Sequence, residues 1–428
     1  MAHQYDFKNY IFIIFLNIFF SYSCISEKNT DITLDSKSLD MILNSYVENG
    51  TWPFLYSKIE HGETGKIIYE HLAINKELLP GKNINSKTWM RIWSMSKLIT
   101  ISLAMDLEED GLIDLKDPVK RYIPEFSNLM VAEDPDGTSI SKSKYTTFDC
   151  PHNYVEMDSI MTINHLLNHR SGFYYALTPS PCLNDLLEKN NILKAENGDK
   201  LINLLSTIPL IQQPGESYFY GMNTSVLGLL LERVTGKSLN QIFVDRIATP
   251  HQIEGLSYIK PEGINLIPTF TGRDGALRKT ADGELDIFGG KVPSYTSENK
   301  LFLGGEGMLG TVDGYIKFMR LLFFNKKEIF LEKRTVNRMS RKPNVEDNKY
   351  GYSTGYGFYL TSSTHTYEKN ILRVGGYEKT TSWVDRKNKL IGTLFSQANE
   401  TQDSDGLSTQ MEQDFKKELY RQLNNIQL

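Results

Sequence analysis

Ser94 and Lys97 form a Ser-x-x-Lys pattern whose residue types and spacing suit nucleophilic acyl transfer. Side chains three positions apart share one face of a helix, so a neutral lysine amine can reach the serine hydroxyl and take its proton. A serine in the first helical turn also has a backbone N–H without an intrahelical acceptor, and this N–H can stabilise an oxyanion. The pattern therefore predicts a serine nucleophile that forms an acyl-enzyme.

The spacing alone does not select the nucleophile, because four other serines begin the same pattern: Ser139, Ser141, Ser257 and Ser297. Only the pattern at Ser94 opens a mainly apolar helical segment, 94–109, directly after an extended aromatic stretch. We expect Lys97 to be buried there, and burial lowers a lysine pKa from about 10.4 toward about 7–8. The alternative role of Ser94 is a plain helix N-cap.

Two other patterns resemble catalytic motifs without their required context. Residues 351–355 match Gly-x-Ser-x-Gly, but a strand pattern follows, and no acidic residue lies between that serine and His365, the one later histidine. His165 and His169 have the spacing of a zinc-binding helix, yet Leu166 stands where the motif needs glutamate. We therefore expect structural roles for these histidines, no metal and no other cofactor.

The order of strand and helix patterns predicts how the chemistry is positioned. Strand patterns lie at 54–59 and 66–73 and return between 355 and 397, whereas helical patterns fill most of 162–331. Helical patterns also stand near both ends, at 38–47 and 410–423. We expect an α+β fold: an antiparallel sheet flanked by N- and C-terminal helices, with an inserted mainly helical domain. The catalytic domain is placed at 38–428, its sheet part at 38–110 and 350–428 and its mainly helical part at 111–349.

The N-terminus has the features of an export signal. Lys8 precedes an apolar run at 10–20 that is too short to span a bilayer, and the run is followed by Ser23 and Cys24. We expect a signal peptide at 1–24, of the lipoprotein type with Cys24 lipidated, and a tether at 25–37. The alternative is a retained anchor helix. Export predicts a bacterial periplasmic protein or a lipoprotein anchored to the inner or outer membrane.

The composition limits the partners and the redox chemistry. The net charge of −5 over 428 residues, with 23% charged residues, does not indicate binding to nucleic acid. In an oxidising compartment Cys150 and Cys182 form an even pair, which either bridges a loop region or remains as two thiols. Metal-ligand spacing of cysteines is absent from the sequence.

Several ordered segments resemble the serine β-lactamase-related family, which includes class C β-lactamases, penicillin-binding DD-peptidases, esterases, acyltransferases and D-amino-acid peptidases. Residues 91–100, Arg-Ile-Trp-Ser-Met-Ser-Lys-Leu-Ile-Thr, resemble its first motif. The further similar segments follow in order at 117–126, 162–172, 214–220, 304–313 and 383–385. The resemblance runs from residue 38 to residue 397, and it implies the β-lactamase/transpeptidase-like fold with Ser94 as nucleophile.

The family's second motif supplies a tyrosine close to the serine and the lysine. The resemblance places this tyrosine at Tyr220, which implies proton transfer in partnership with Lys97. The alternative for Tyr220 is a core aromatic residue. Met222 occupies the position where the common motif has asparagine, a departure associated with the esterase and acyltransferase branch. Met222 and Trp93 are expected to contact the substrate.

The third motif maps to Val374-Gly375-Gly376, where the glycines let a substrate approach the strand backbone. The resemblance implies that the N–H groups of Ser94 and Tyr377 form the oxyanion hole. Val374 replaces the lysine that faces the substrate carboxylate in β-lactamases and DD-peptidases, and such a charge-assisted contact is worth about 1.5–3 kcal/mol.

The missing cation favours a neutral ester or amide as substrate, so we expect an exported esterase or acyl hydrolase. One alternative keeps the serine chemistry but acts on β-lactams, D-amino-acid peptides or DD-peptides. The other is a non-catalytic sensor of peptidoglycan or another ligand, since a fold does not fix a function. In the catalytic cases the partner is a small-molecule ester, amide or peptide.

Overall fold

The computed structural model of this protein describes residues 32–142, 150, 152–190, 195–281, 284, 295–341, 352–361, 365–403 and 409–426. The expected signal peptide with Cys24, and the first part of the expected tether, lie outside the described residues. The chain divides after Thr33, and the elements below all belong to the unit Leu34–Leu428. Within the described residues, no helix has the length and apolarity that crossing a membrane requires.

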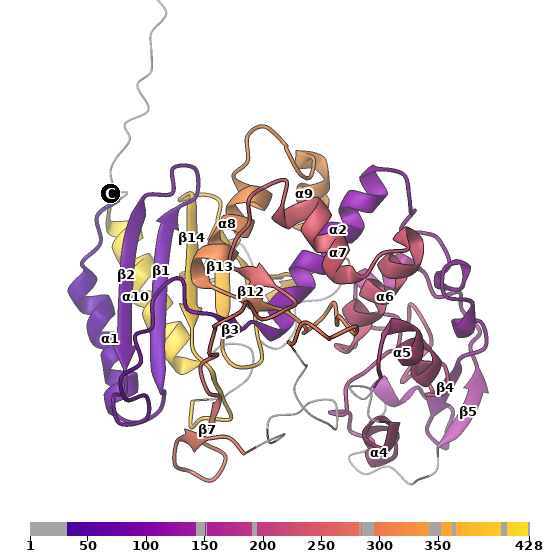
Figure 1. Ribbon diagram of the computed structural model, residues 1–428. Coiled ribbons are helices and arrows are strands. Elements are labelled where there is room, and N and C mark those ends of the chain that lie inside the picture. Colours follow the sequence, from indigo (N-terminus) through magenta and orange to yellow (C-terminus); the bar gives the residue numbers. More distant parts are fainter. Residues whose placement is uncertain are drawn as a thin grey trace, which may run out of the picture. The chain divides into compact units, whose positions relative to one another are not determined.

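A seven-stranded antiparallel sheet, in the order β10-β11-β12-β13-β14-β1-β2, forms the central layer of this unit (Figure 1). Its strands are β1 (Phe54–His61), β2 (Ile67–Ile74), β10 (Tyr352–Thr354), β11 (Tyr359–Thr361), β12 (Leu372–Gly375), β13 (Thr381–Asp385) and β14 (Leu390–Phe395). β1 pairs with β14, with Tyr56 opposite Phe395, so segments from opposite ends of the chain meet in the middle of the sheet. This confirms the predicted sheet built from both ends of the catalytic domain.

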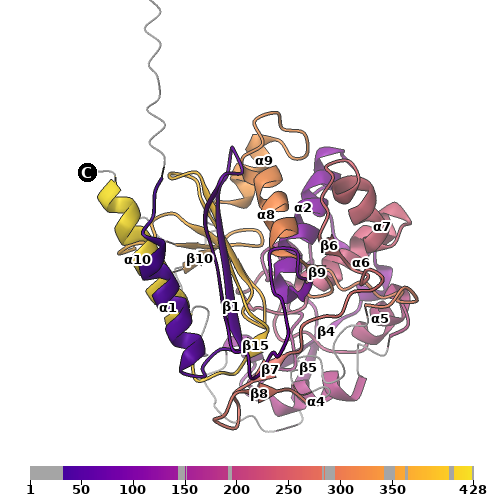
Figure 2. The ribbon, with the colours of Figure 1, turned by 60° about the vertical axis from the view of Figure 1, so that its left-hand side comes forward.

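Helices cover both faces of the sheet. α1 (Ser36–Glu48) and α10 (Gln410–Ile426) lie side by side on one face, and α8 (Val312–Phe323) packs against β13 and β14 on the other (Figure 2). α1 buries Leu39, Leu43 and Val47, which recur every fourth residue and therefore form one apolar face. The predicted N- and C-terminal flanking helices are thus confirmed.

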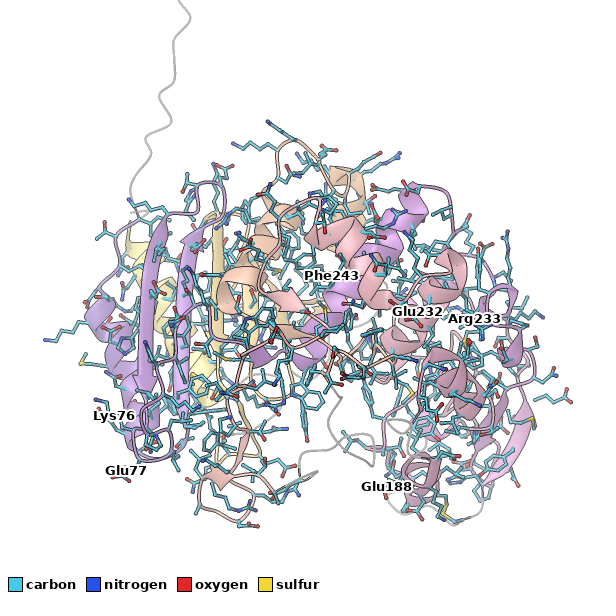
Figure 3. The ribbon with its side chains drawn as sticks, in the orientation of Figure 1. Lys76, Glu77, Glu188, Glu232, Arg233 and Phe243 are labelled. Atoms are coloured by element: carbon cyan, nitrogen blue, oxygen red, sulfur yellow. A yellow bond between two sulfur atoms is a disulfide. The ribbon has the colours of Figure 1, made fainter. Side chains whose placement is uncertain are left out.

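A mainly helical part lies between the two groups of sheet strands in the sequence. Its helices are α3 (Ile163–Leu167), α4 (Pro181–Asn190), α5 (Gly198–Leu205), α6 (Asn223–Thr235), α7 (Leu239–Phe243) and α9 (Lys333–Met339). Short strands accompany them: β3 (Met90–Arg91), β4 (Met130–Glu133), β5 (Asn153–Glu156), β6 (Leu256–Ser257), β7 (Phe270–Thr271), β8 (Arg278–Lys279), β9 (Leu309–Gly310) and β15 (Ala398–Asn399). In Figure 3, Phe243 lies within the helical part, whereas Lys76 and Glu77 lie on the exposed turn after β2.

The long buried helix predicted from Ser94 begins slightly later than expected. Ser94 lies in a short 3-10 turn, Trp93–Met95, and the α-helix proper is α2 (Ser96–Glu109). α2 packs against α6, and most of its residues are buried on every side, which explains its nearly continuous apolar sequence.

Two further sequence expectations are decided by the fold. Ser353 lies in strand β10, and the strand pattern predicted after the Gly-x-Ser-x-Gly sequence corresponds to β11, so the strand-to-helix turn of that motif is not formed here. Cys150 and Cys182 are joined in a disulfide with their Cα atoms 6.1 Å apart, so the bridged alternative is the observed one.

Candidate active site

Ser94 is held on a tight turn between β3 and α2. The residue before it, Trp93, has a φ of 45°, a left-handed conformation that non-glycine residues rarely adopt. The Trp93 side chain is fully buried, and its ring packs edge-on against the ring of Tyr377 with 5.5 Å between centroids. Burial of this large side chain stabilises the strained turn, and the turn presents the Ser94 hydroxyl to the pocket.

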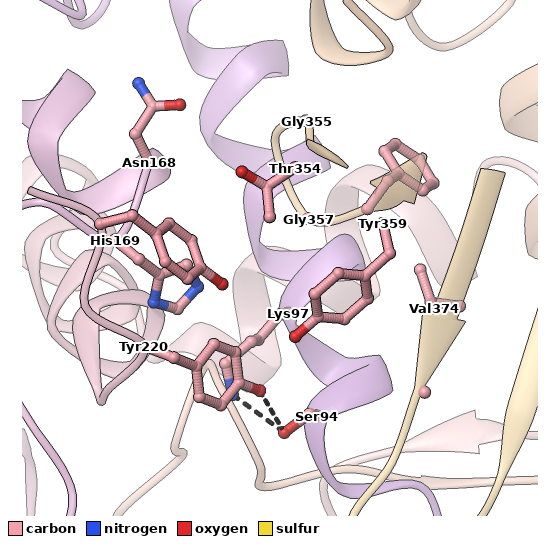
Figure 4. Close-up of a pocket in the computed structure, with 13 residues that line it drawn as sticks. Ser94, Lys97, Asn168, His169, Tyr220, Thr354, Gly355, Gly357, Tyr359 and Val374 are labelled. Carbon is pink, nitrogen blue, oxygen red and sulfur yellow. Dashed lines mark hydrogen bonds between the residues drawn. The ribbon is translucent and has the colours of Figure 1, made fainter. Parts of the chain in front are cut away.

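Lys97 and Tyr220 both reach the Ser94 hydroxyl oxygen. Lys97 Nζ, from the first turn of α2, donates to Ser94 Oγ at 3.1 Å. The Tyr220 hydroxyl, from the loop that leads into α6, donates to the same oxygen at 2.8 Å (Figure 4). The structure therefore brings together the three residues predicted to act in catalysis.

Lys97 is buried as predicted, but it is not neutral. Burial lowers the pKa of Lys97, whereas its interactions with Tyr220 and with the Glu306 carboxylate raise it by more, so the net pKa lies above the ordinary value. Lys97 Nζ also contacts Tyr175 Oη at 2.9 Å and the Gly305 carbonyl oxygen at 3.0 Å. The expectation that burial leaves a neutral amine was wrong, because the sequence-based argument did not include a buried counter-charge.

That counter-charge is Glu306, a residue for which the sequence predicted no role. Glu306 Oε1 lies 3.2 Å from Lys97 Nζ, and the side chain is fully buried. Its carboxylate also accepts hydrogen bonds from Tyr175 Oη and, at 2.5 Å, from Ser225 Oγ. The one sequence feature that could have indicated Glu306 is that it is the single acidic residue in the glycine-rich turn at 304–307. An acidic residue in such a turn is ordinarily taken to be exposed on a loop.

Tyr377 is brought close to the nucleophile by Gly376. A Cβ atom at residue 376 would overlap the carbonyl oxygen of Ile92 and the Thr380 hydroxyl, so only glycine lets the segment after β12 lie against residue 92. Within the described part of the chain, no hydrogen-bond acceptor is found for the backbone N–H of Ser94 or of Tyr377. Both N–H groups therefore remain available for the predicted oxyanion hole.

A narrow pocket with a cavity volume of about 30 Å³ lies beside Ser94 and Lys97 (Figure 4). Of the residues predicted to bind substrate, Val374 and Gly375 line it. The sequence did not predict the other lining residues, which are Asn168, His169, Tyr218, Thr354, Gly355, Gly357, Phe358 and Tyr359. Met222 is buried at the N-cap of α6, and neither it nor Trp93 or Gly376 is among the described residues that line this pocket.

His169 supports Tyr220. Its ring stacks on the Tyr220 ring with 4.8 Å between centroids and 24° between the planes. The backbone N–H of Gly221 donates to His169 Nδ1 at 3.4 Å. Burial and the nearby Lys97 charge lower the pKa of His169 to about 3, so the ring is neutral. The stacking and the Gly221 contact give this histidine a positioning role. Among the described residues, no group of three or more His, Cys, Asp or Glu side chains could hold a metal ion.

Known proteins resemble this chain in sequence and in fold. The family model described as Beta-lactamase matches residues 62–413. Monacolin J acid methylbutanoyltransferase of Aspergillus terreus is 26% identical over 260 residues, 60% of this chain and 58% of that protein. Lovastatin esterase of Penicillium rubens is 25% identical over 391 residues, which cover 83% of this chain and 92% of the esterase.

A similar fold is seen in the structure of EstCE1, a hydrolase with promiscuous acyltransferase activity, with a TM-score of 0.71 and 20% identity. That match covers 90% of this chain and 98% of EstCE1. At this identity the likeness shows the shared fold alone. The chain spans 57–58% of the length of the first curated relatives that it matches.

Proposed function

The chain belongs to the Beta-lactamase family, and on this premise we propose that it is a serine hydrolase that acts on neutral esters or amides through an acyl-enzyme at Ser94. The observation that carries this proposal is the convergence of Lys97 Nζ and Tyr220 Oη on one oxygen, Ser94 Oγ, at 3.1 and 2.8 Å. Such convergence on a pocket-facing hydroxyl is the arrangement of an activated nucleophile, and a ligand sensor does not require it.

In acylation, Tyr220, Ser94 and the two oxyanion-hole N–H groups each have one role. Tyr220, in its phenolate form, accepts the Ser94 proton while Oγ forms a bond to the substrate carbonyl carbon. The N–H groups of Ser94 and Tyr377 hold the resulting oxyanion. The tetrahedral intermediate then expels the alcohol or amine, and Tyr220 returns the proton to this leaving group.

Deacylation reverses the same proton path. A water molecule gives a proton to the Tyr220 phenolate as its oxygen attacks the acyl carbon, and the proton returns to Ser94 Oγ when the acid departs. Lys97 remains an ammonium throughout, and its charge balances the phenolate or the developing alkoxide. In this mechanism Tyr220 alone exchanges the proton, and Lys97 supplies a fixed positive charge in place of the proton-accepting role expected from the sequence.

The pocket favours an uncharged substrate. Of the described residues that line it, only Lys97 has a cationic side chain, and Glu306 already pairs with that charge. A substrate carboxylate would therefore lose a charge-assisted contact worth about 1.5–3 kcal/mol. Val374 at the third motif, together with relatives named as an esterase and an acyltransferase, supports ester chemistry over β-lactam or DD-peptide hydrolysis.

The test combines labelling with substrate comparison. A fluorophosphonate probe should modify Ser94, as located by peptide mapping, and short-chain nitrophenyl esters should be turned over faster than a chromogenic cephalosporin or a D-Ala-D-Ala peptide. Ser94→Ala and Lys97→Ala should each lower kcat roughly 10⁴-fold or more. Absence of labelling would contradict serine catalysis, and faster cephalosporin turnover would favour the β-lactamase alternative. Adding an alcohol as acyl acceptor shows how much of the acyl group is transferred to the alcohol and how much is hydrolysed by water.

We also infer that the protein is exported, with Cys24 as a lipid anchor. The support is the apolar run at 10–20, which lies outside the described residues, and the Cys150–Cys182 disulfide, a bond that persists in oxidising compartments. Metabolic labelling with a radioactive fatty acid should mark the wild-type chain but not Cys24→Ser. Retention of the unprocessed, unlabelled chain in the cytoplasm would contradict both export and lipidation at Cys24.

A further inference from the structure

Glu306 joins three segments around the nucleophile. The glycine-rich turn supplies its carboxylate, α2 supplies Lys97, and Tyr175 and Ser225 come from the loop after α3 and from α6. We propose that Glu306 is a positioning residue of the proposed acyl-transfer site, whose carboxylate fixes Lys97 as an ammonium so that Tyr220, and not Lys97, exchanges the Ser94 proton. This inference rests on the proposed function and deepens it.

The burial of the pair is the first support. Only 5% of the Lys97 side chain and 0% of the Glu306 side chain are exposed. A buried ammonium without a counter-charge loses its hydration and releases its proton, whereas a carboxylate at 3.2 Å compensates for that loss. The charge of Lys97 is therefore set by Glu306, and the spacing to Ser94 alone does not determine it.

The hydrogen bonds around Glu306 are the second support. Oε1 accepts from Lys97 and Tyr175, and Oε2 accepts from Ser225, whose Oγ in turn accepts the Gly305 backbone N–H at 3.1 Å. Three donors thus converge on this one carboxylate. Burial and the Glu306 charge raise the pKa of Tyr175 well above its usual range, so Tyr175 stays a phenol and donates a hydrogen bond to Glu306.

The close packing of the turn is the third support. A Cβ at Gly305 would lie 3.2 Å from Lys97 Nζ and 2.9 Å from Ser225 Oγ, and one at Gly304 would lie 2.9 Å from the Thr100 methyl group. Glycines at both positions let the turn pack tightly against α2 and α6. The turn thus places the Glu306 carboxylate against Lys97, while Gly304 and Gly305 add no side chain there.

The proposal predicts a pH signature. Among the described residues, the titratable groups that face Lys97 are Glu306, Tyr175, Tyr220 and His169. If Lys97 must be an ammonium, the labelling rate falls as Lys97 loses its proton at alkaline pH. Glu306→Gln removes the negative charge 3.2 Å from Lys97 Nζ, so it favours the neutral amine. The alkaline limb of the pH profile should therefore move to lower pH by roughly 1–3 pH units.

The experiment measures the rate of fluorophosphonate labelling of Ser94 against pH, which requires no knowledge of the natural substrate. Ser225→Ala removes a hydrogen bond to Glu306 but keeps the charge, so it should change the rate without moving the alkaline limb. Glu232→Gln removes a half-buried carboxylate on α6 that accepts the backbone N–H of Leu239 at the start of α7, and it should leave the alkaline limb in place.

The outcomes separate this inference from the proposed function. Failure of the wild-type protein to label would contradict the proposed function itself. Labelling of the wild type, combined with an unmoved alkaline limb in a folded Glu306→Gln variant, would overturn the role of Glu306 alone. If Glu306→Gln does not fold, the ¹⁵N chemical shift of Lys97 Nζ in the wild-type protein decides: an ammonium at pH 7 supports the proposal, and a neutral amine overturns it.

Discussion

The Tyr220 hydroxyl donates a 2.8 Å hydrogen bond to Ser94 Oγ, although 126 positions separate the two residues in the chain. The stacked His169 ring holds the phenol on one side, and Lys97 Nζ lies 5.0 Å from the centre of its ring. Tyr220 is therefore fixed between a neutral aromatic ring and a cation, with 36% of its surface exposed toward the pocket. This placement suits a proton carrier that meets both the nucleophile and a leaving group.

Tyr220→Phe isolates the role of the hydroxyl. The ring and its stacking on His169 remain, so we expect little change in the free energy of unfolding but a loss in kcat of roughly 10²–10⁴-fold. Ester hydrolysis and thermal unfolding measure the two quantities. Tyr122→Phe is a matched control, because it removes a hydroxyl that donates to Asp117, and neither residue lines the pocket with Ser94. A Tyr220→Phe enzyme with nearly full kcat would assign the proton transfer to another group.

Lys97→Met tests the energetic coupling between Lys97 and Glu306. The substitution leaves a buried carboxylate without its cation, which should cost about 3–5 kcal/mol of stability. The double variant Lys97→Met with Glu306→Gln removes the unpaired charge and should recover a large part of that loss. Urea unfolding of the two single variants and the double variant completes the cycle. Strictly additive effects would show that the two charges do not stabilise each other.

Val374→Lys places a cation where the third motif has none. It should shift the ratio of kcat/KM for a carboxylate-bearing cephalosporin over a neutral nitrophenyl ester by roughly 10–100-fold toward the cephalosporin, since the charge-assisted contact is worth about 1.5–3 kcal/mol. Val374→Met controls for side-chain length without charge. An unchanged ratio in a folded Val374→Lys enzyme would show that the substrate carboxylate does not reach this strand.

His169 predicts a dependence of stability on pH. Its pKa is about 3 in the fold and 6.5 when unperturbed, so between these values the unfolded state binds more protons and the free energy of unfolding falls as the pH falls. From pH 7 to pH 5 this one group should cost about 2 kcal/mol. His169→Asn suits the φ of 52° at this position and cannot titrate, so its stability should change less over the same range.

Equal slopes for the wild type and His169→Asn between pH 7 and pH 5 would contradict this assignment. The comparison must be made between the two proteins, because burial also lowers the pKa values of His152, His165 and His251. These three histidines contribute to the slope in the same direction in both proteins, and the difference therefore reports on His169.

The sequence by itself determined the local features of the site. The spacing from Ser94 to Lys97 and the apolar pattern of α2 are properties of one short stretch of chain, and they sufficed to single out Ser94 as the candidate nucleophile and to predict that Lys97 is buried. Strand patterns at both ends of the catalytic domain and helical patterns between them predicted the fold class, because the periods of strands and helices are read directly from neighbouring residues.

Only the tertiary structure decided the charge of that lysine. Glu306 and Tyr175 lie 209 and 78 positions from Lys97, and no local pattern links a carboxylate in a glycine-rich turn to a lysine on α2. The stacking of His169 on Tyr220 and the disulfide between Cys150 and Cys182 are likewise long-range contacts. The protonation state of a buried group depends on every charge packed around it, and the fold, not the spacing along the chain, brings those charges together.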